Sequence, residues 1–96
     1  MPWSGANLPW NRSAILLQVP SAPGIYVIWR DAVAIYVGET QDLQSRLLEH
    51  FKGSNPRITE QQPTTFGFEL SHGAARLPRQ ESLIAELRPL CNQPAS

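Results

Sequence analysis

The 96-residue sequence has little cysteine, no net charge and no long apolar run. Its single cysteine, Cys91, excludes an internal disulfide and a zinc site built from several cysteines, and it suits a reducing compartment. Eight basic and eight acidic residues cancel, which argues against polybasic nucleic-acid binding but leaves room for a local basic patch. Because no apolar run reaches about 18 residues and no signal peptide is evident, we expect a cytoplasmic protein without a membrane span.

What the chain does contain is typical of one small globular domain. Hydrophobic residues make up 42% of the sequence, which is enough for one modest core and too little for two. We interpret residues 1–96 as a single domain with its core over about 20–94 and an N-terminal extension over 1–19. Within that extension residues 13–18 favour a short helix, and its isolated tryptophans are expected to pack onto the domain.

Two consecutive runs predict a β-hairpin. Residues 24–29, Gly-Ile-Tyr-Val-Ile-Trp, are β-branched or aromatic almost throughout, and residues 34–37 form a second such run after a short connection. If the hairpin is symmetric about Asp31, Tyr26 and Tyr36 lie directly opposite each other, with Cβ atoms roughly 5 Å apart. A shift of the register by one residue would undo this pairing.

Helices are predicted after the hairpin and near the C-terminus. The first has Thr40 as its N-cap and ends at Gly53, before a polar loop with room for a short helical turn. Its apolar stripe consists of Leu43, Leu47, Leu48 and Phe51. Residues 65–70 alternate as a third strand, and the last helix has Pro78 in its first turn and stops before Pro89. This β-β-α-β-α order predicts an α/β fold in which helices flank a small three-stranded antiparallel or mixed sheet.

Six residues, in order along the chain, resemble the motif of a known family. They are Tyr26 of Gly-Ile-Tyr and Tyr36 of Tyr-Val-Gly, then Arg46, His50, Glu81 and Asn92. The tyrosines are ten residues apart, the arginine follows ten residues later, and the histidine comes four after that. No single piece is specific, but the conjunction resembles the GIY-YIG nuclease family over about residues 20–94.

The resemblance implies a metal-dependent phosphodiester hydrolase, an endonuclease that uses one Mg²⁺ or Mn²⁺ ion to cleave DNA. It implies that Glu81 binds the metal and that Tyr26, Tyr36, Arg46, His50 and Asn92 complete the catalytic site. DNA is the implied partner, with branched or damaged forms among the candidates. A second copy of the chain, or another protein, is left open as the source of specificity.

Phosphodiester hydrolysis also gives a physical reason for these residue types. A guanidinium such as that of Arg46 offers a permanent fork of donors to phosphate oxygens, and one carboxylate with several waters suits Mg²⁺. Tyr26 and His50 compete as the base, because a free tyrosine has a pKa near ~10 and needs nearby cations to act at neutral pH. We expect Tyr26 to take the proton of water with help from His50, while Tyr36 and Arg46 hold the phosphate.

Two other interpretations stay open. The first is a catalytically weak or silent nucleic-acid-binding module that acts with a partner protein. Glu39, an acid directly after the Tyr-Val-Gly triplet, favours it, as does the balanced charge. The cations expected to border the cleft and bind nucleic acid are Lys52, Arg57 and Arg79. The second is a plain protein-interaction domain, which would show no metal affinity at Glu81.

Overall fold

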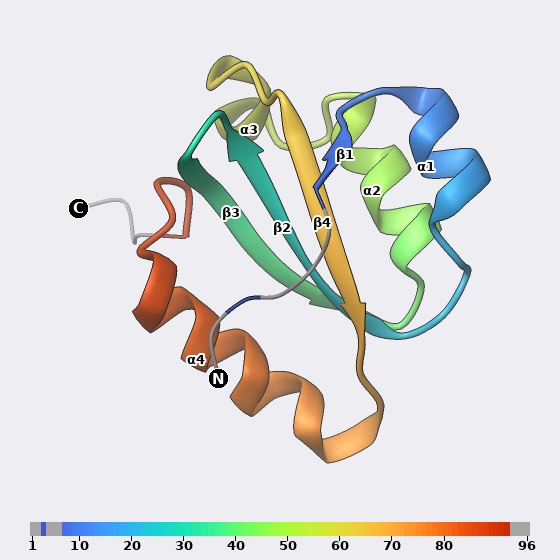
Figure 1. The fold of residues 1–96 in the computed structure, drawn as a ribbon, viewed down its shortest axis with the longest axis vertical. Helices are drawn as coiled ribbons and strands as arrows, with labels where there is room; N and C mark the ends of the chain where they lie inside the picture. Colours follow the sequence, from blue (N-terminus) through green and yellow to red (C-terminus); the bar gives the residue numbers. More distant parts are fainter. Residues whose placement is uncertain (1–2, 4–6, 93–96) are drawn as a thin grey trace.

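The chain folds as one antiparallel sheet between helices (Figure 1). The computed structural model describes Trp3 and residues 7–92. Within these residues the strands are β1 (Leu8–Pro9), β2 (Gly24–Arg30), β3 (Val33–Thr40) and β4 (Thr65–Leu70), in the sheet order β1-β4-β2-β3. The helices are α1 (Arg12–Gln18), α2 (Leu43–Phe51), α3 (Pro56–Glu60) and α4 (Arg76–Leu87), with a 3-10 turn, η1, at Gly73–Ala75. The expected α/β fold is confirmed.

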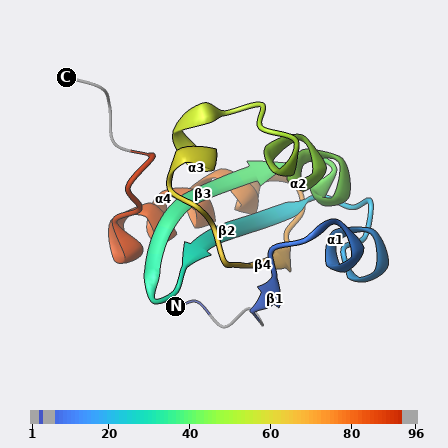
Figure 2. The ribbon, with the colours of Figure 1, turned by 90° about the horizontal axis from the view of Figure 1, so that it is seen from above.

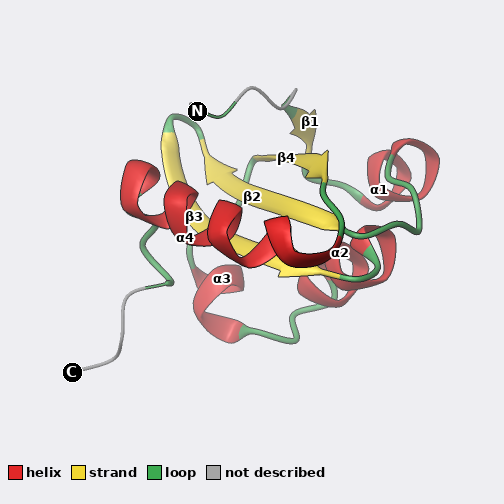
Figure 3. Cartoon of the chain, turned by 90° about the horizontal axis from the view of Figure 1, so that it is seen from below, coloured by secondary structure: helices red, strands yellow, loops and turns green. Residues whose placement is uncertain are grey.

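The sheet separates two apolar cores. Helices α1 and α2 lie side by side on one side of it (Figures 1 and 2), and α4 runs across β2 and β3 on the other (Figure 3). The core on the α2 side includes Ile15, Tyr26, Ile28, Ile35, Leu43, Leu47, Ile58 and Phe66. The core on the α4 side includes Ile25, Val27, Ala34, Val37 and Leu83. Strand β2 supplies both cores, which explains why its sequence is apolar without alternation.

A strand that the sequence pattern did not reveal, β1, extends the sheet at the β4 edge. It pairs Leu8 with Phe66 and Pro9 with Thr65. Two residues, one of them a proline, show no alternation, and an edge position is where a sheet tolerates proline. The following helix, α1, buries Ile15 completely, so the segment from β1 to α1 packs as part of the same domain.

The register of the hairpin differs from the expected one. Tyr26 pairs with Gly38, and Tyr36 pairs with Ile28, so the prediction that the two tyrosines face each other directly is wrong. The connection between the two strands is shorter than expected. Asp31, with φ of 53°, begins a tight turn, and a β-bulge after Ile28 shifts the register. The shift at Tyr26 is two residues, an even number, so both tyrosines stay on the same face of the sheet.

Helix α2 begins two residues later than predicted. Asp42 is its N-cap, and the Asp42 carboxylate accepts a hydrogen bond from the Ser45 backbone N–H at 3.1 Å. Thr40 is still in β3, where its hydroxyl accepts from the Asp42 N–H at 3.1 Å. Threonine and aspartate are both favourable N-cap residues, so the sequence alone did not show which of the two begins the helix. The end is as expected: α2 stops at Phe51, and Gly53 follows with φ of 92°.

The remaining helices are short. Helix α3 is a short helical turn within the predicted polar loop, where Asn55 caps it, Pro56 begins it and the buried Ile58 anchors it. Helix α4 ends at Leu87, before Arg88 in a left-handed conformation, as the following proline predicted. None of the helices in the described part of the chain is long and apolar enough to cross a membrane.

Candidate active site

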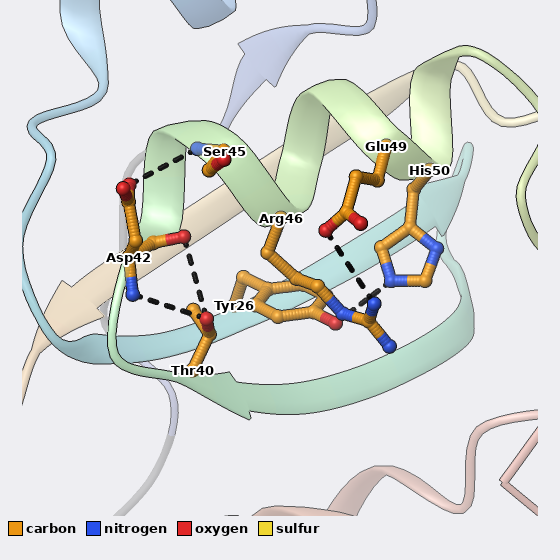
Figure 4. A network of polar contacts seen from close by, with 7 residues as sticks. All are labelled: Tyr26, Thr40, Asp42, Ser45, Arg46, Glu49 and His50. Atoms are coloured by element: carbon orange, nitrogen blue, oxygen red, sulfur yellow. Dashed lines mark hydrogen bonds and ion pairs between the residues drawn. The ribbon is translucent and has the colours of Figure 1, made fainter.

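Three of the predicted site residues meet as rings on the α2 side of the sheet. The ring centroids of Tyr26 and Tyr36 are 6.0 Å apart, and the His50 ring lies 5.5 Å from the first and 5.4 Å from the second. The tyrosines come from the hairpin, whereas His50 and Arg46 project from α2 one turn apart. Figure 4 shows Tyr26, Arg46 and His50 converging between α2 and the hairpin.

A buried hydrogen bond joins Tyr26 and His50. The Tyr26 hydroxyl and His50 Nε2 are 2.8 Å apart, and the two residues are only 1% and 2% exposed. Burial, assisted by the charge of Arg46, lowers the pKa of His50 to about 4, so the imidazole is neutral at neutral pH. The second ring nitrogen, Nδ1, is buried without a hydrogen-bond partner in the described part of the chain. His50 is therefore a neutral imidazole able to accept the phenolic proton.

Tyr26 is a protonated phenol in this environment. Burial raises its pKa well above the ordinary value, and the neighbouring Tyr36 adds to this effect. Hydrogen bonding to Arg46 lowers the pKa of Tyr26 but does not offset burial, and the same bond raises the pKa of Arg46. Arg46 by itself thus does not create the tyrosinate that a simple base mechanism needs.

The glycines of the two triplets make room for this packing. A Cβ atom at Gly38 would overlap the hydroxyl and ring of Tyr26, its cross-strand partner. A Cβ atom at Gly24 would overlap the Glu69 carbonyl oxygen and the Leu43 side chain. The Tyr26 phenol thus packs directly against the backbone of β3 at Gly38. This contact explains why the second triplet has a glycine at that position.

Arg46 presents its guanidinium to solvent above these rings. Its side chain is 42% exposed, and its ion pair with Glu49, three residues on along α2, has an N–O distance of 3.6 Å. Such an exposed pair is weak, so a phosphate group can displace it. Asp42 and Thr40 hold the start of α2 against β3 (Figure 4), which places Arg46 above the tyrosines.

Asn92 contacts the backbone behind the site. Its Oδ1 accepts from the Val37 N–H at 2.7 Å, and its Nδ2 donates to the Val37 carbonyl at 2.8 Å. The Leu90 and Cys91 N–H groups donate to the carbonyls of Ala34 and Ile35. Residues 90–92 thus pair with the outer edge of β3, and Asn92 holds the middle residue of the Tyr-Val-Gly triplet.

Glu81 lies on α4, across the sheet from Tyr26. It is exposed and has no hydrogen bond or ion pair to any residue that the structure describes. Those residues also contain no group of three His, Cys, Asp or Glu side chains that would enclose a metal ion. A metal bound at Glu81 would therefore take most of its ligands from water, an arrangement that suits Mg²⁺.

The three cations predicted to bind nucleic acid have different surroundings. Lys52 and Arg57 are exposed, at the end of α2 and in α3. Arg79 is committed to Glu69 of β4, with Nε and Oε1 2.5 Å apart and Nη2 and Oε2 3.4 Å apart. Sequence reasoning missed Arg76, which pairs with Glu39, because nothing in the pattern brings these two residues together.

Comparison with known proteins decides the family. A model of the GIY-YIG catalytic domain matches residues 22–82. The chain belongs to the GIY-YIG family. The match runs from just before β2 into α4 and includes every predicted site residue except Asn92. The family, the fold and the class of enzyme, a GIY-YIG endonuclease domain, are thus as the sequence motif predicted.

Sequence relatives of this GIY-YIG domain are much longer proteins. The UvrABC system protein C of Deinococcus radiodurans is 29% identical over 76 residues, which is 77% of this chain and 12% of the relative. The protein of the same name from Vibrio parahaemolyticus is 43% identical over 47 residues, 48% of this chain and 8% of the relative. The chain therefore spans a small fraction of the length of these proteins.

Solved structures share the GIY-YIG fold. The N-terminal endonuclease domain of UvrC from Thermotoga maritima, bound to its catalytic divalent cation, magnesium, superposes with a TM-score of 0.72 at 23% identity, covering 82% of this chain and 91% of that chain. A point mutant of the same domain, also with its catalytic divalent cation, gives a TM-score of 0.75 and covers 86% and 94% of the two chains. At this level of identity the likeness shows the shared fold.

Proposed function

We propose that this domain is a metal-dependent endonuclease that hydrolyses phosphodiester bonds in DNA. The observation that carries the proposal is the buried hydrogen bond between Tyr26 and His50, beside the exposed guanidinium of Arg46. A phenol joined to a neutral imidazole can pass on a proton, and an adjacent guanidinium can hold a phosphate. Family membership and the magnesium in the related UvrC domain support the same reading.

In this mechanism His50 makes Tyr26 a competent base. Arg46 and Tyr36 hold the scissile phosphate, and Arg46 stabilises the charge that develops on its oxygens. Tyr26 accepts a proton from the attacking water while its own hydroxyl proton moves to His50 Nε2. This concerted transfer avoids a free tyrosinate, which burial disfavours. A divalent cation at Glu81 would stabilise the departing oxygen.

Glu81 is proposed as the metal ligand because of its place in the motif and its exposure on α4. Around the helix, Arg79 faces a glutamate of β4 and Arg76 faces a glutamate of β3. At about 100° per residue, Glu81 lies about 140° beyond Arg76 in the sense away from Arg79. Leu83 of the same helix is fully buried against the sheet and lies about 160° from Glu81 around α4, so Glu81 points away from the sheet into solvent.

A silent nucleic-acid-binding module is the second candidate. It draws support from the balanced charge of the sequence and from the raised pKa of Tyr26, which follows from burial. Specificity supplied by a second copy or another protein, and a cytoplasmic location, remain predictions.

Cleavage of DNA by the purified domain tests the proposal. Plasmid, branched and single-stranded DNA are incubated in Mg²⁺ or Mn²⁺, with EDTA and Glu81→Ala as the metal controls. We expect both to abolish cleavage, whereas Glu60→Ala, which removes an exposed carboxylate of α3, leaves it intact. Tyr26→Phe should lower the rate by roughly 100-fold or more. DNA binding without cleavage by the wild type would favour the silent module.

A further inference from the structure

The ion pair between Arg76 and Glu39 lies beside the proposed site and has no part in the mechanism above. Glu39 directly follows Gly38, the residue beneath the Tyr26 hydroxyl. The pKa of Tyr26 is raised mainly by burial, and the Glu39 carboxylate contributes in the same direction, so it lies within electrostatic reach of the phenol. Arg76 therefore stands at the same end of β3 as the tyrosine cluster, on the side of α4.

The two arginines in the first turns of α4 hold their glutamates differently. Arg76 contacts Glu39 through Nε alone, at 2.5 Å from Oε2, and no other hydrogen bond or ion pair of its guanidinium is found with the described residues. Arg79 engages both carboxylate oxygens of Glu69. The pairs are buried alike, at 16% and 27% side-chain exposure against 19% and 26%. Glu39 thus orients the Arg76 guanidinium, and the N–H groups of its two Nη atoms remain available to another acceptor.

We propose that Arg76, oriented by Glu39, binds a second phosphate of the nucleic-acid substrate, next to the phosphate bound by Arg46. This inference rests on the proposed function. The two arginines project from α2 and α4, which lie on opposite faces of the sheet, so a nucleic-acid strand that runs along the β3 edge would meet one guanidinium from each face. Arginine forks suit phosphate oxygens, and such contacts set the register of a backbone without reading its sequence. Glu39, which in the sequence favoured a silent module, instead positions an arginine for DNA.

A DNA-binding experiment in EDTA tests this assignment. Binding is measured by the fluorescence anisotropy of labelled DNA at about 50 to 200 mM salt. The informative variant is Glu39→Gln together with Arg76→Gln, because it keeps the net charge and leaves no unpaired carboxylate. We expect about ten-fold weaker binding than wild type, and a salt slope smaller in magnitude by about one. Thermal unfolding checks that the variant is folded.

Two comparisons make the outcome specific to Arg76. Arg30→Gln removes one positive charge at the opposite end of β2, where Nη1 contacts Gln61, and should leave the salt slope of binding unchanged. The same double exchange at Glu69 and Arg79 tests the competing assignment. Unchanged binding in the Glu39 and Arg76 variant, or a larger loss in the Glu69 and Arg79 variant, overturns the inference. If the wild type neither binds nor cleaves DNA, the proposed function fails and the inference with it.

Discussion

At the scale of single residues, His50 is the most unusual group in the molecule. It is a histidine buried to 2% exposure, with one nitrogen bonded to Tyr26 and the other unpartnered among the described residues. An unpaired polar atom in a core costs stability, and such sites persist where they serve another purpose. In the proposed mechanism, this neutral ring accepts the proton that Tyr26 gives up.

The stability of the domain should therefore fall as the pH drops from 6.5 to 4. Burial lowers the pKa of His50 from 6.5 to about 4, so in this range the unfolded chain binds a proton that the folded chain excludes. The contribution is complete above pH 6.5, and on the order of 3 kcal/mol is lost by pH 4. Urea unfolding of wild type and His50→Gln across this range measures it.

The control for that experiment is His72→Gln, since His72 is exposed in the turn before η1. It should keep the pH dependence of the wild type, whereas His50→Gln should flatten it. Equal slopes in all three proteins would show that His50 does not titrate in this way.

At the scale of elements, β3 is an edge strand whose outer side is covered by residues 90–92. Asn92 is decisive in this, because its amide pairs with both backbone groups of Val37, as another strand would. Val37 lies between Tyr36 and Gly38, so this contact positions the tyrosine and the glycine over which Tyr26 packs. We therefore assign Asn92 as a positioning residue.

Asn92→Ala should loosen this edge and slow cleavage. We expect a loss of about 1–3 kcal/mol in the free energy of unfolding, because two backbone groups lose their partners. Hydrogen exchange should accelerate at the Val37 amide but not in β4, and kcat should fall more than KM rises. Asn7→Ala, at an exposed position, is the matched control. Full protection of the Val37 amide in Asn92→Ala would contradict this role.

At the scale of the whole molecule, one sheet couples two cores. Strand β2 pairs with β3 and β4 and buries side chains on both faces, so neither core is complete without it. In a domain of this size, such sharing favours a single cooperative unfolding transition.

Leu47→Ala on the α2 side and Leu83→Ala on the α4 side should each lower the free energy of unfolding by about 2–5 kcal/mol. Both leucines are fully buried, whereas Leu17 is 83% exposed, so Leu17→Ala should change stability by less than about 0.5 kcal/mol. Because Trp10 and Trp29 report on opposite faces, tryptophan fluorescence and far-UV circular dichroism should give coincident transitions. Separate transitions would show that the two cores unfold independently.

The sequence by itself determined the family, the main strands and helices, and the residues that gather at the site. These features depend on local periodicity, on turn and capping residues, and on the spacing of a motif, all of which are present along the chain. Tyr26, Tyr36, Arg46 and His50 were identified in this way, and the structure brings them together. The end of α4 before Pro89 was predicted in the same way, because a proline affects the residues next to it in sequence.

Only the tertiary structure decided the features that join distant segments. Strand β1, the hairpin register, the choice of Asp42 as N-cap, the hold of Asn92 on Val37 and the pairing of Glu39 with Arg76 each depend on such contacts. The protonation of Tyr26 and His50 also belongs here, because burial sets their pKa values and burial is a property of the packed molecule. A one-dimensional pattern states which groups are available, and packing determines their neighbours and their charge.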